Sequence, residues 1–165
     1  VEEFKAWKSK GIKLDRLMLE LRKNMRLVEG AGNVVSQLHN LGIITAIISD
    51  SPNLVVDDVA KRLGIKYFAS IRILFTKEGL AYDTVPSHPS GDQRVSKLAA
   101  LKDFINRENI KFSEVAFVGN DKEDVELFKF VGRPIAFNPK DMEAKKAAQA
   151  IVNSKTLEDV LEYIL

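Results

Sequence analysis

Small polar and acidic residues follow two apolar runs of the chain, and they are the residues whose chemistry stands out. Ser49-Asp50-Ser51 follows the β-branched run 43–48, and Gly119-Asn120-Asp121 follows the apolar run 115–118, with Asp124 one helical turn further on. Carboxylate oxygens suit a hard cation such as Mg²⁺, and the free N–H groups at a helix start favour phosphate. The pattern indicates a phosphate and metal site, although Ser49, Asp50 or Asp121 taken singly is better explained as a helix N-cap.

The elements that must position these residues alternate between strands and helices from residue 43 onward. The β-branched run 43–48 is typical of a strand covered on both faces in a parallel sheet. Further strands are expected at 71–75, 80–85, 115–118, 133–137 and 151–152, and helices at 30–41, 53–63, 93–107, 121–130, 140–150 and 156–164. The alternation predicts a doubly wound, mainly parallel α/β sheet. Two of the strands, 71–75 and 80–85, flank Lys77-Glu78-Gly79 and predict a β-hairpin.

Both polar segments follow expected strands, and ligands of open α/β sheets bind outside the carboxyl ends of the strands. This architecture would therefore bring the two polar segments to one edge of the sheet.

Residues 1–28 differ from this α/β body and predict amphipathic helices. Their apolar side chains recur at three- and four-residue spacing, at Leu14, Leu17, Met18 and Leu21. We therefore expect a helical segment, residues 1–28, and an α/β core, residues 29–165.

The composition excludes several classes of protein. The chain has 165 residues, 45% of them hydrophobic, which is enough for a packed core and too many for a disordered tail. It has no cysteine, which excludes disulfide scaffolds and zinc thiolate sites. The net charge of +2 comes from interspersed signs, so we expect no nucleic-acid partner. Neither a membrane span nor a signal peptide is evident, and we expect a cytoplasmic protein.

Several short motifs, in this order, resemble those of the haloacid dehalogenase superfamily and its phosphoserine-phosphatase-like branch. They are Ser49 at a strand end, Lys97 within residues 96–101, and Gly119-Asn120-Asp121-x-x-Asp124. The segments 124–129 and 136–140 and the hairpin around Gly79 are similar to the branch as well. The resemblance runs from about residue 26 to the end of the chain. It implies a Rossmann-like sheet and a helical cap, of which residues 1–28 would be a part.

The resemblance also implies an activity, which is the magnesium-dependent hydrolysis of a small phosphorylated metabolite. Ser49 and Lys97 would bind the transferred phosphoryl group. Asp50 and Ser51 could add a backbone phosphate nest, or merely cap a helix. The implied magnesium ligands are Asn120, Asp121 and Asp124.

This sequence departs from the family pattern in two places, and these departures leave two functional hypotheses. The family's nucleophile and general acid lie in an Asp-x-Asp-x-Thr/Val motif on a first strand, and this sequence has no such motif. Asn120 stands where the family has a magnesium-binding aspartate, which should lower metal affinity unless Asp121 compensates. The chain also begins without methionine. We expect either an enzyme whose upstream segment completes the sheet, this chain being inactive alone, or a non-catalytic module that binds a ligand or partner with a degraded site.

Overall fold

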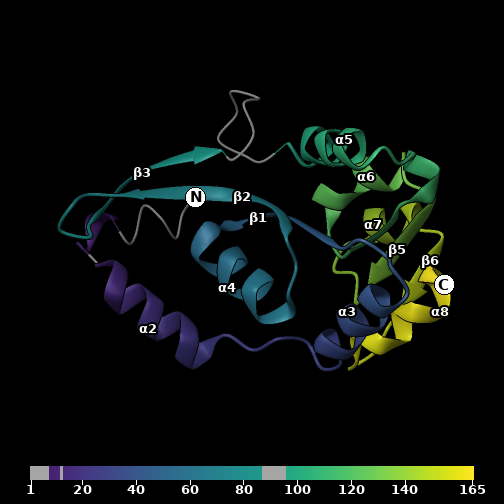
Figure 1. Cartoon of the computed structure of the whole chain (residues 1–165), viewed down its shortest axis with the longest axis horizontal. Helices are drawn as coiled ribbons and strands as arrows, with labels where there is room; N and C mark the ends of the chain where they lie inside the picture. The colour runs from purple at the N-terminus through teal and green to yellow at the C-terminus, as the bar shows by residue number, and fades with distance from the viewer. Residues whose placement is uncertain (1–7, 12, 87–95) are drawn as a thin grey trace. The chain divides into compact units, whose positions relative to one another are not determined.

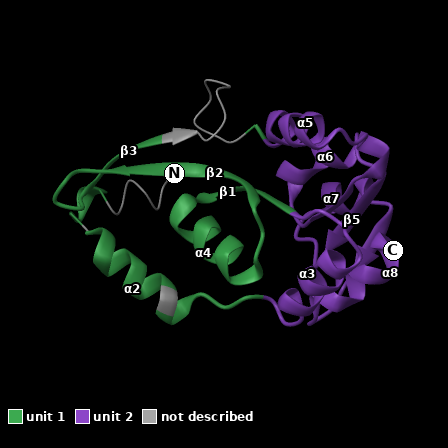
Figure 2. Cartoon of the chain, viewed as in Figure 1, with its two compact units in different colours: residues 1–27, 46–96 green, residues 28–45, 97–165 purple. Residues whose placement is uncertain are grey.

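The computed structural model describes residues 8–11, 13–86 and 96–165, and it is an α/β structure (Figure 1). The chain divides into two compact units, residues 1–27 with 46–96 and residues 28–45 with 97–165 (Figure 2). The division into a helical cap, residues 1–28, and a core, residues 29–165, stays a prediction. Within the described ranges, no helix is both long and apolar enough to cross a membrane.

The first unit is a three-stranded sheet with helices, in the strand order β1-β2-β3. Its elements are α2 (Leu14–Asn24), β1 (Ala46–Pro52), α4 (Asn53–Leu63), β2 (Tyr67–Phe75) and β3 (Ala81–Pro86). Strands β1 and β2 are parallel, and α4 connects them and buries Val56 and Ala60. Strands β2 and β3 are antiparallel, which confirms the predicted hairpin. The predicted helix 1–28 is shorter than expected in its described part, because the backbone becomes extended at Met25.

Strand β1 differs from the predicted strand 43–48 at both ends. It begins at Ala46 and continues through the polar residues to Pro52, so the predicted strand end at residue 48 is wrong. Ile48 is aligned with Ala69 and Pro52 with Ile71, so β1 advances four residues while β2 advances two. The intervening residues 49–51 therefore form a bulge, a feature over-represented next to active sites.

The second unit is a three-stranded, fully parallel sheet in the order β4-β5-β6. Its strands are β4 (Ala116–Gly119), β5 (Arg133–Phe137) and β6 (Ala150–Val152). Its helices are α3 (Ala31–Asn40), α5 (Lys97–Glu108), α6 (Val125–Phe128), α7 (Met142–Ala147) and α8 (Leu161–Ile164), and its 3₁₀ turns are η1 (Phe112–Glu114), η2 (Lys122–Asp124) and η3 (Leu157–Val160).

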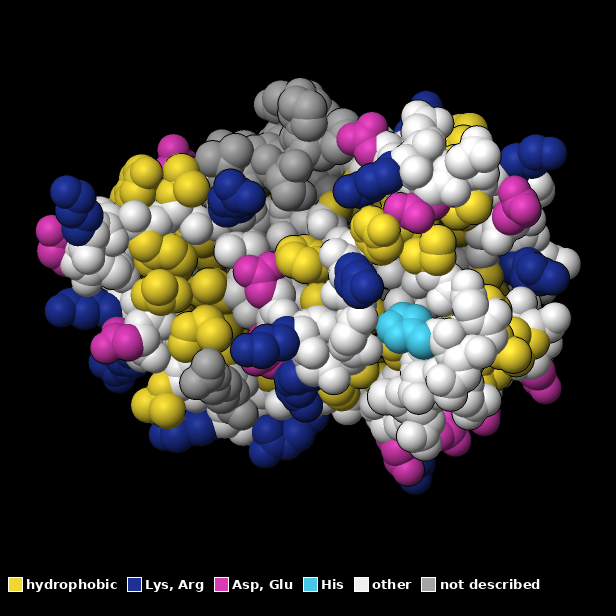
Figure 3. Space-filling view, in the orientation of Figure 1, with side chains coloured by type: hydrophobic (Ala, Val, Ile, Leu, Met, Phe, Trp, Pro, Cys, Tyr) yellow, Lys and Arg dark blue, Asp and Glu magenta, His cyan; other side chains and the backbone are white. Residues whose placement is uncertain are grey.

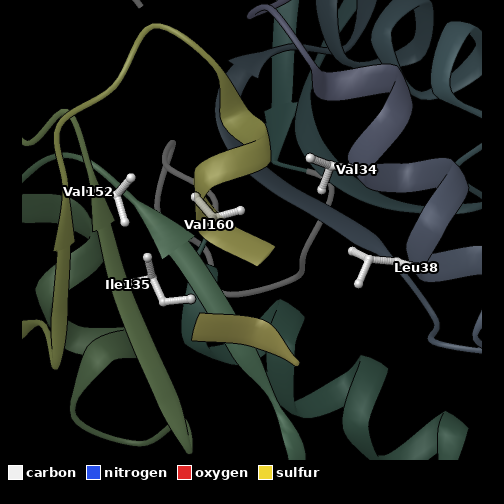
Figure 4. Close-up of a cluster of buried hydrophobic side chains, with 5 residues drawn as sticks. All are labelled: Val34, Leu38, Ile135, Val152 and Val160. Carbon is white, nitrogen blue, oxygen red and sulfur yellow. The ribbon is translucent and has the colours of Figure 1, made fainter. Parts of the chain in front are cut away.

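Successive residues of the central strand β5 pack on opposite faces of this sheet. Ile135 belongs to a buried cluster with side chains from α3, β6 and η3, which are Val34, Leu38, Val152 and Val160 (Figure 4). Its neighbour Ala136 belongs to a second cluster, with Phe128 of α6 and Ala144 of α7. Helices thus cover both faces, as a doubly wound sheet requires. This confirms the predicted fold class.

Two predicted helices of this unit begin later than expected, and both are preceded by an aspartate. Asp121 and Asp141 have extended backbones at N-cap positions, so regular turns begin only at Lys122 and Met142. A helix from 121 to 130 is replaced by η2 and the short helix α6. Of the predicted helix 93–107, residues 93–95 lie outside the described part, and α5 begins at Lys97.

Candidate phosphate and metal site

The first part of the site is an ion pair between Lys97, the first residue of α5, and Asp124, the last residue of η2. Lys97 Nζ donates to Asp124 Oδ1 at 2.7 Å. The two side chains are 12% and 6% exposed, so the pair lies almost entirely out of solvent. A charge-assisted bond of this length holds both groups in place. Two residues that the sequence analysis singled out, 27 positions apart, are therefore in direct contact.

The second oxygen of Asp124 binds the loop that follows β4. Asp124 Oδ2 accepts from the backbone N–H of Asn120 at 2.8 Å and, more weakly, from that of Asp121 at 3.4 Å. Gly119 makes this possible, because a Cβ atom there would lie 2.6 Å from the Asp124 carboxyl carbon. One oxygen of Asp124 therefore holds the Lys97 ammonium group, and the other holds the loop.

Asp121 caps the 3₁₀ turn η2. Its Oδ1 accepts from the N–H of Glu123 at 3.1 Å, and Asp121 and Asp124 form a reciprocal capping box. Burial raises the pKa of the Asp121 carboxyl, the negative charge of Asp124 raises it further, and Lys97 opposes both effects. The capping interpretation thus holds for Asp121, and the raised pKa shows that a negative charge at this position is disfavoured.

Replacing Asp121 by asparagine should raise the free energy of unfolding at neutral pH. Asparagine keeps an oxygen for the Glu123 N–H and removes the disfavoured charge. A carboxyl whose folded pKa is raised above its ordinary 3.8 contributes stability below that pH and loses it as pH rises through the folded pKa. The gain from Asp121→Asn should be negligible near pH 3 and grow toward pH 7. Urea unfolding across this range measures it, with exposed Glu126→Gln as the control, and a pH-independent gain would contradict the assignment.

The residues around this loop suit a hard divalent cation in the chemistry of their donors. The side chains of Asn120, Asp121 and Asp124 offer only oxygen, and Mg²⁺ is commonly held by one or two carboxylates, with waters and substrate phosphates completing its shell. Both Asp124 oxygens and Asp121 Oδ1 already accept hydrogen bonds, which leaves Asp121 Oδ2 and the amide oxygen of Asn120 as the oxygens for which no such bond is shown. The described part of the chain contains no group of three or more His, Cys, Asp or Glu side chains able to hold a metal. Any metal here would therefore depend on further oxygens.

The polar residues of β1 lie in the first unit. Within the bulge, Ser49 Oγ accepts from the N–H of Ser51 at 3.1 Å, and residues 49–51 are half-buried. The N-cap of α4 is Pro52, which rules out the interpretation of Ser49, Asp50 or Ser51 as the cap of that helix. Their predicted convergence with Lys97 on one phosphate stays a prediction.

One residue of this region, Asp141, was not singled out by the sequence analysis. Asp141 Oδ2 accepts from the backbone N–H of Lys122 at 3.1 Å. Nearby, the N–H of Lys140 donates to the carbonyl oxygen of Asn120 at 2.8 Å. The expected helix 140–150 placed Asp141 inside a helix, where nothing distinguishes it from other surface acids. The sequence feature that could have identified Asp141 is its position before a helix and just beyond the carboxyl end of a strand.

Known proteins resemble this chain in sequence. The family described as haloacid dehalogenase-like hydrolase matches residues 91–164. The phosphoserine phosphatase of Methanocaldococcus jannaschii is 25% identical over 142 residues, and that of Lactococcus lactis is 27% identical over 145 residues. These alignments cover 86% and 88% of this chain and 65% of each relative. The chain thus spans about two thirds of the length of these enzymes.

Solved structures share the fold. A structure described as a substrate-bound phosphoserine phosphatase complex superimposes with a TM-score of 0.83 at 22% identity, covering 94% of this chain and 71% of that one. An apo phosphoserine phosphatase also reaches 0.83, at 20% identity, covering 100% of this chain and 84% of that one. At these identities the likeness establishes the fold alone.

Proposed function

Because the chain belongs to the haloacid dehalogenase superfamily, on its phosphoserine-phosphatase-like branch, we propose that it forms most of a phosphomonoester hydrolase for a small phosphorylated metabolite. One observation carries this proposal: the buried ion pair of Lys97 and Asp124, joined to an oxygen-rich loop at the carboxyl end of β4. A fixed cation beside such a loop suits a transferring phosphoryl group, whose charge is spread over three oxygens. A cytoplasmic location belongs to the same proposal.

Lys97 has the central role, which is to stabilise negative charge on the phosphoryl group. An ammonium group has three donors, so it can bind a phosphoryl oxygen while it keeps its bond to Asp124. Because Asp124 fixes Lys97 beforehand, little side-chain freedom remains to be lost on binding. In this proposal the Ser49 hydroxyl donates to another phosphoryl oxygen, and the backbone of Asp50 and Ser51 contributes N–H groups.

We further propose that Mg²⁺ binds beside the loop, held by Asn120 and Asp121, while Asp124 holds the backbone N–H groups of these two residues. The ion would supply positive charge to the phosphoryl oxygens. Asn120 contributes no charge of its own, so the affinity should be modest. Asp121 supports the site in this chain, because a cation beside its carboxylate would offset the unfavourable charge that its raised pKa reveals.

The nucleophile is proposed to come from an added segment, because these 165 residues contain no Asp-x-Asp motif. One aspartate of that segment would attack phosphorus while the other, as the general acid, gives its proton to the leaving ester oxygen, and water would then hydrolyse the aspartyl phosphate to release inorganic phosphate. The open strand edges support such an addition: among the described residues, β1 pairs only with β2, and β4 only with β5. Hydrophobic side chains also gather on a face of the first unit (Figure 3). Leu80 and Tyr82 are among the exposed hydrophobic residues of this unit.

The second candidate function is a non-catalytic module that binds a phosphorylated ligand or a partner. The replacement of an acid by Asn120, together with the missing Asp-x-Asp motif, favours it. Both candidates need the phosphate-binding residues, and only the enzyme needs an added carboxylate.

Titration with inorganic phosphate in the presence of Mg²⁺, followed by amide NMR, tests the proposed binding site. We expect saturable shifts at residues 49–51 and at 120–121, which would also test whether the two segments meet. Lys97→Met should weaken binding by about tenfold or more, since a charge-assisted contact is lost. Lys102→Met, on an exposed part of α5, is the matched control. Ser49→Ala gives an independent variant if Lys97→Met proves unstable. Unchanged affinity in both variants would refute the site.

A further inference from the structure

We propose that Asp141 is a positioning residue for the proposed metal-binding loop, acting through the backbone N–H of Lys122. This inference rests on the proposed function, because it assigns Asp141 a role in holding Asn120 and Asp121 ready for a cation. Asp141 would not contact the ion. It would set the course of the backbone that carries the two ligands.

The first observation is the unusual use of an N-cap aspartate. Asp141 occupies the N-cap position of α7 with an extended backbone, at φ −110° and ψ 146°. An aspartate there normally accepts from an N–H in the first turn of its own helix. Asp141 makes no such bond, and its Oδ2 instead accepts from Lys122 N–H, 19 residues earlier in the chain. The carboxylate that would ordinarily cap α7 therefore binds the neighbouring loop.

The second observation is a reciprocal tie between the same two loops. The N–H of Lys140 donates to the carbonyl oxygen of Asn120 at 2.8 Å, while Lys122 N–H donates to Asp141. The two bonds join the loop after β4 to the loop after β5 on either side of Asp121. The backbone of Asp121 is therefore held from both neighbouring residues.

The third observation is that two aspartates, Asp124 and Asp141, bind different groups in this region. Asp124 binds the N–H groups of Asn120 and Asp121 and also pairs with Lys97, so it holds both the loop and the Lys97 ammonium group. Asp141 binds only the N–H of Lys122 among the hydrogen bonds that the structure shows for its side chain. Its contribution can therefore be changed without touching the ion pair. Residues that hold metal ligands in place typically change metal affinity by about 10–100-fold when they are replaced.

The test measures Mg²⁺ affinity by NMR titration and the hydrogen-exchange rate of the Lys122 amide, in the 165-residue chain. Asp141→Ala should weaken Mg²⁺ binding about tenfold and accelerate exchange at Lys122. Asp141→Asn keeps an acceptor oxygen and should restore both values to near those of the parent. Glu143→Ala removes a charge of the same sign from the same helix and should change neither.

The outcomes separate this inference from the proposed function. Parent-like affinity and exchange in Asp141→Ala would overturn the inference, and so would an Asp141→Asn variant as weak as Asp141→Ala, because charge rather than the hydrogen bond would then matter. If the parent chain shows no saturable Mg²⁺ binding, the proposed metal site fails. In that case exchange at Lys122 and Asp121 alone decides whether Asp141 positions the loop.

Discussion

Replacing Asp124 by alanine should lower the free energy of unfolding by about 3–5 kcal/mol, the usual cost of removing one partner of a buried ion pair. The variant leaves the Lys97 ammonium, on a side chain only 12% exposed, without its carboxylate. It also removes the acceptor for the N–H groups of Asn120 and Asp121. Two separate losses thus follow from one substitution, which is why we expect so large an effect.

Urea unfolding followed by circular dichroism measures this effect, and two variants interpret it. Glu126→Ala removes an exposed acid from the adjoining helix α6 and should change stability by less than about 0.5 kcal/mol. Lys97→Met should cost less than Asp124→Ala, because Asp124 would keep its backbone donors. A cost below about 1 kcal/mol for Asp124→Ala would mean that the pair does not hold this part of the protein together.

The second large effect concerns catalysis in a version of the protein that carries an Asp-x-Asp segment in front of residue 1. In that protein, Lys97→Ala should lower kcat/KM for p-nitrophenyl phosphate by at least about 10²–10³-fold, because a fixed charge beside the transferring phosphoryl group is lost. Lys102→Ala, further along α5, should leave turnover near that of the parent. Parent-like turnover in Lys97→Ala would remove this residue from the active site.

The sequence predicts the strands of the second unit to within one residue, because their signals are local. The strand expected at 115–118 is β4, Ala116–Gly119, and the strand expected at 133–137 is β5. Lys97 is expected near Asp124 only through the resemblance to the haloacid dehalogenase superfamily, because a lysine inside the expected helix 93–107 is otherwise like any other helix lysine. A strand end, a glycine and an acid one turn later form a pattern that periodicity and residue type suffice to detect.

Features that depend on pairing between distant segments could not be predicted in this way. The bulge at residues 49–51 arises from the register of β1 against β2, and no residue of β1 alone specifies it. The same holds for Asp141, whose carboxylate serves Lys122 in another loop instead of its own helix. An N-cap aspartate has the same sequence signature whether it caps locally or reaches across, so only the folded chain distinguishes the two cases.

The most direct test of the central claim is phosphate release from p-nitrophenyl phosphate in Mg²⁺, measured side by side on the 165-residue chain and on the version extended by an Asp-x-Asp segment. We expect no release above background from the 165 residues alone, and turnover in the extended protein that requires Lys97. Robust release by the 165-residue chain would contradict the proposed function, because a carboxylate within these residues, with Asp50 and Asp121 as the first candidates, would then be the nucleophile.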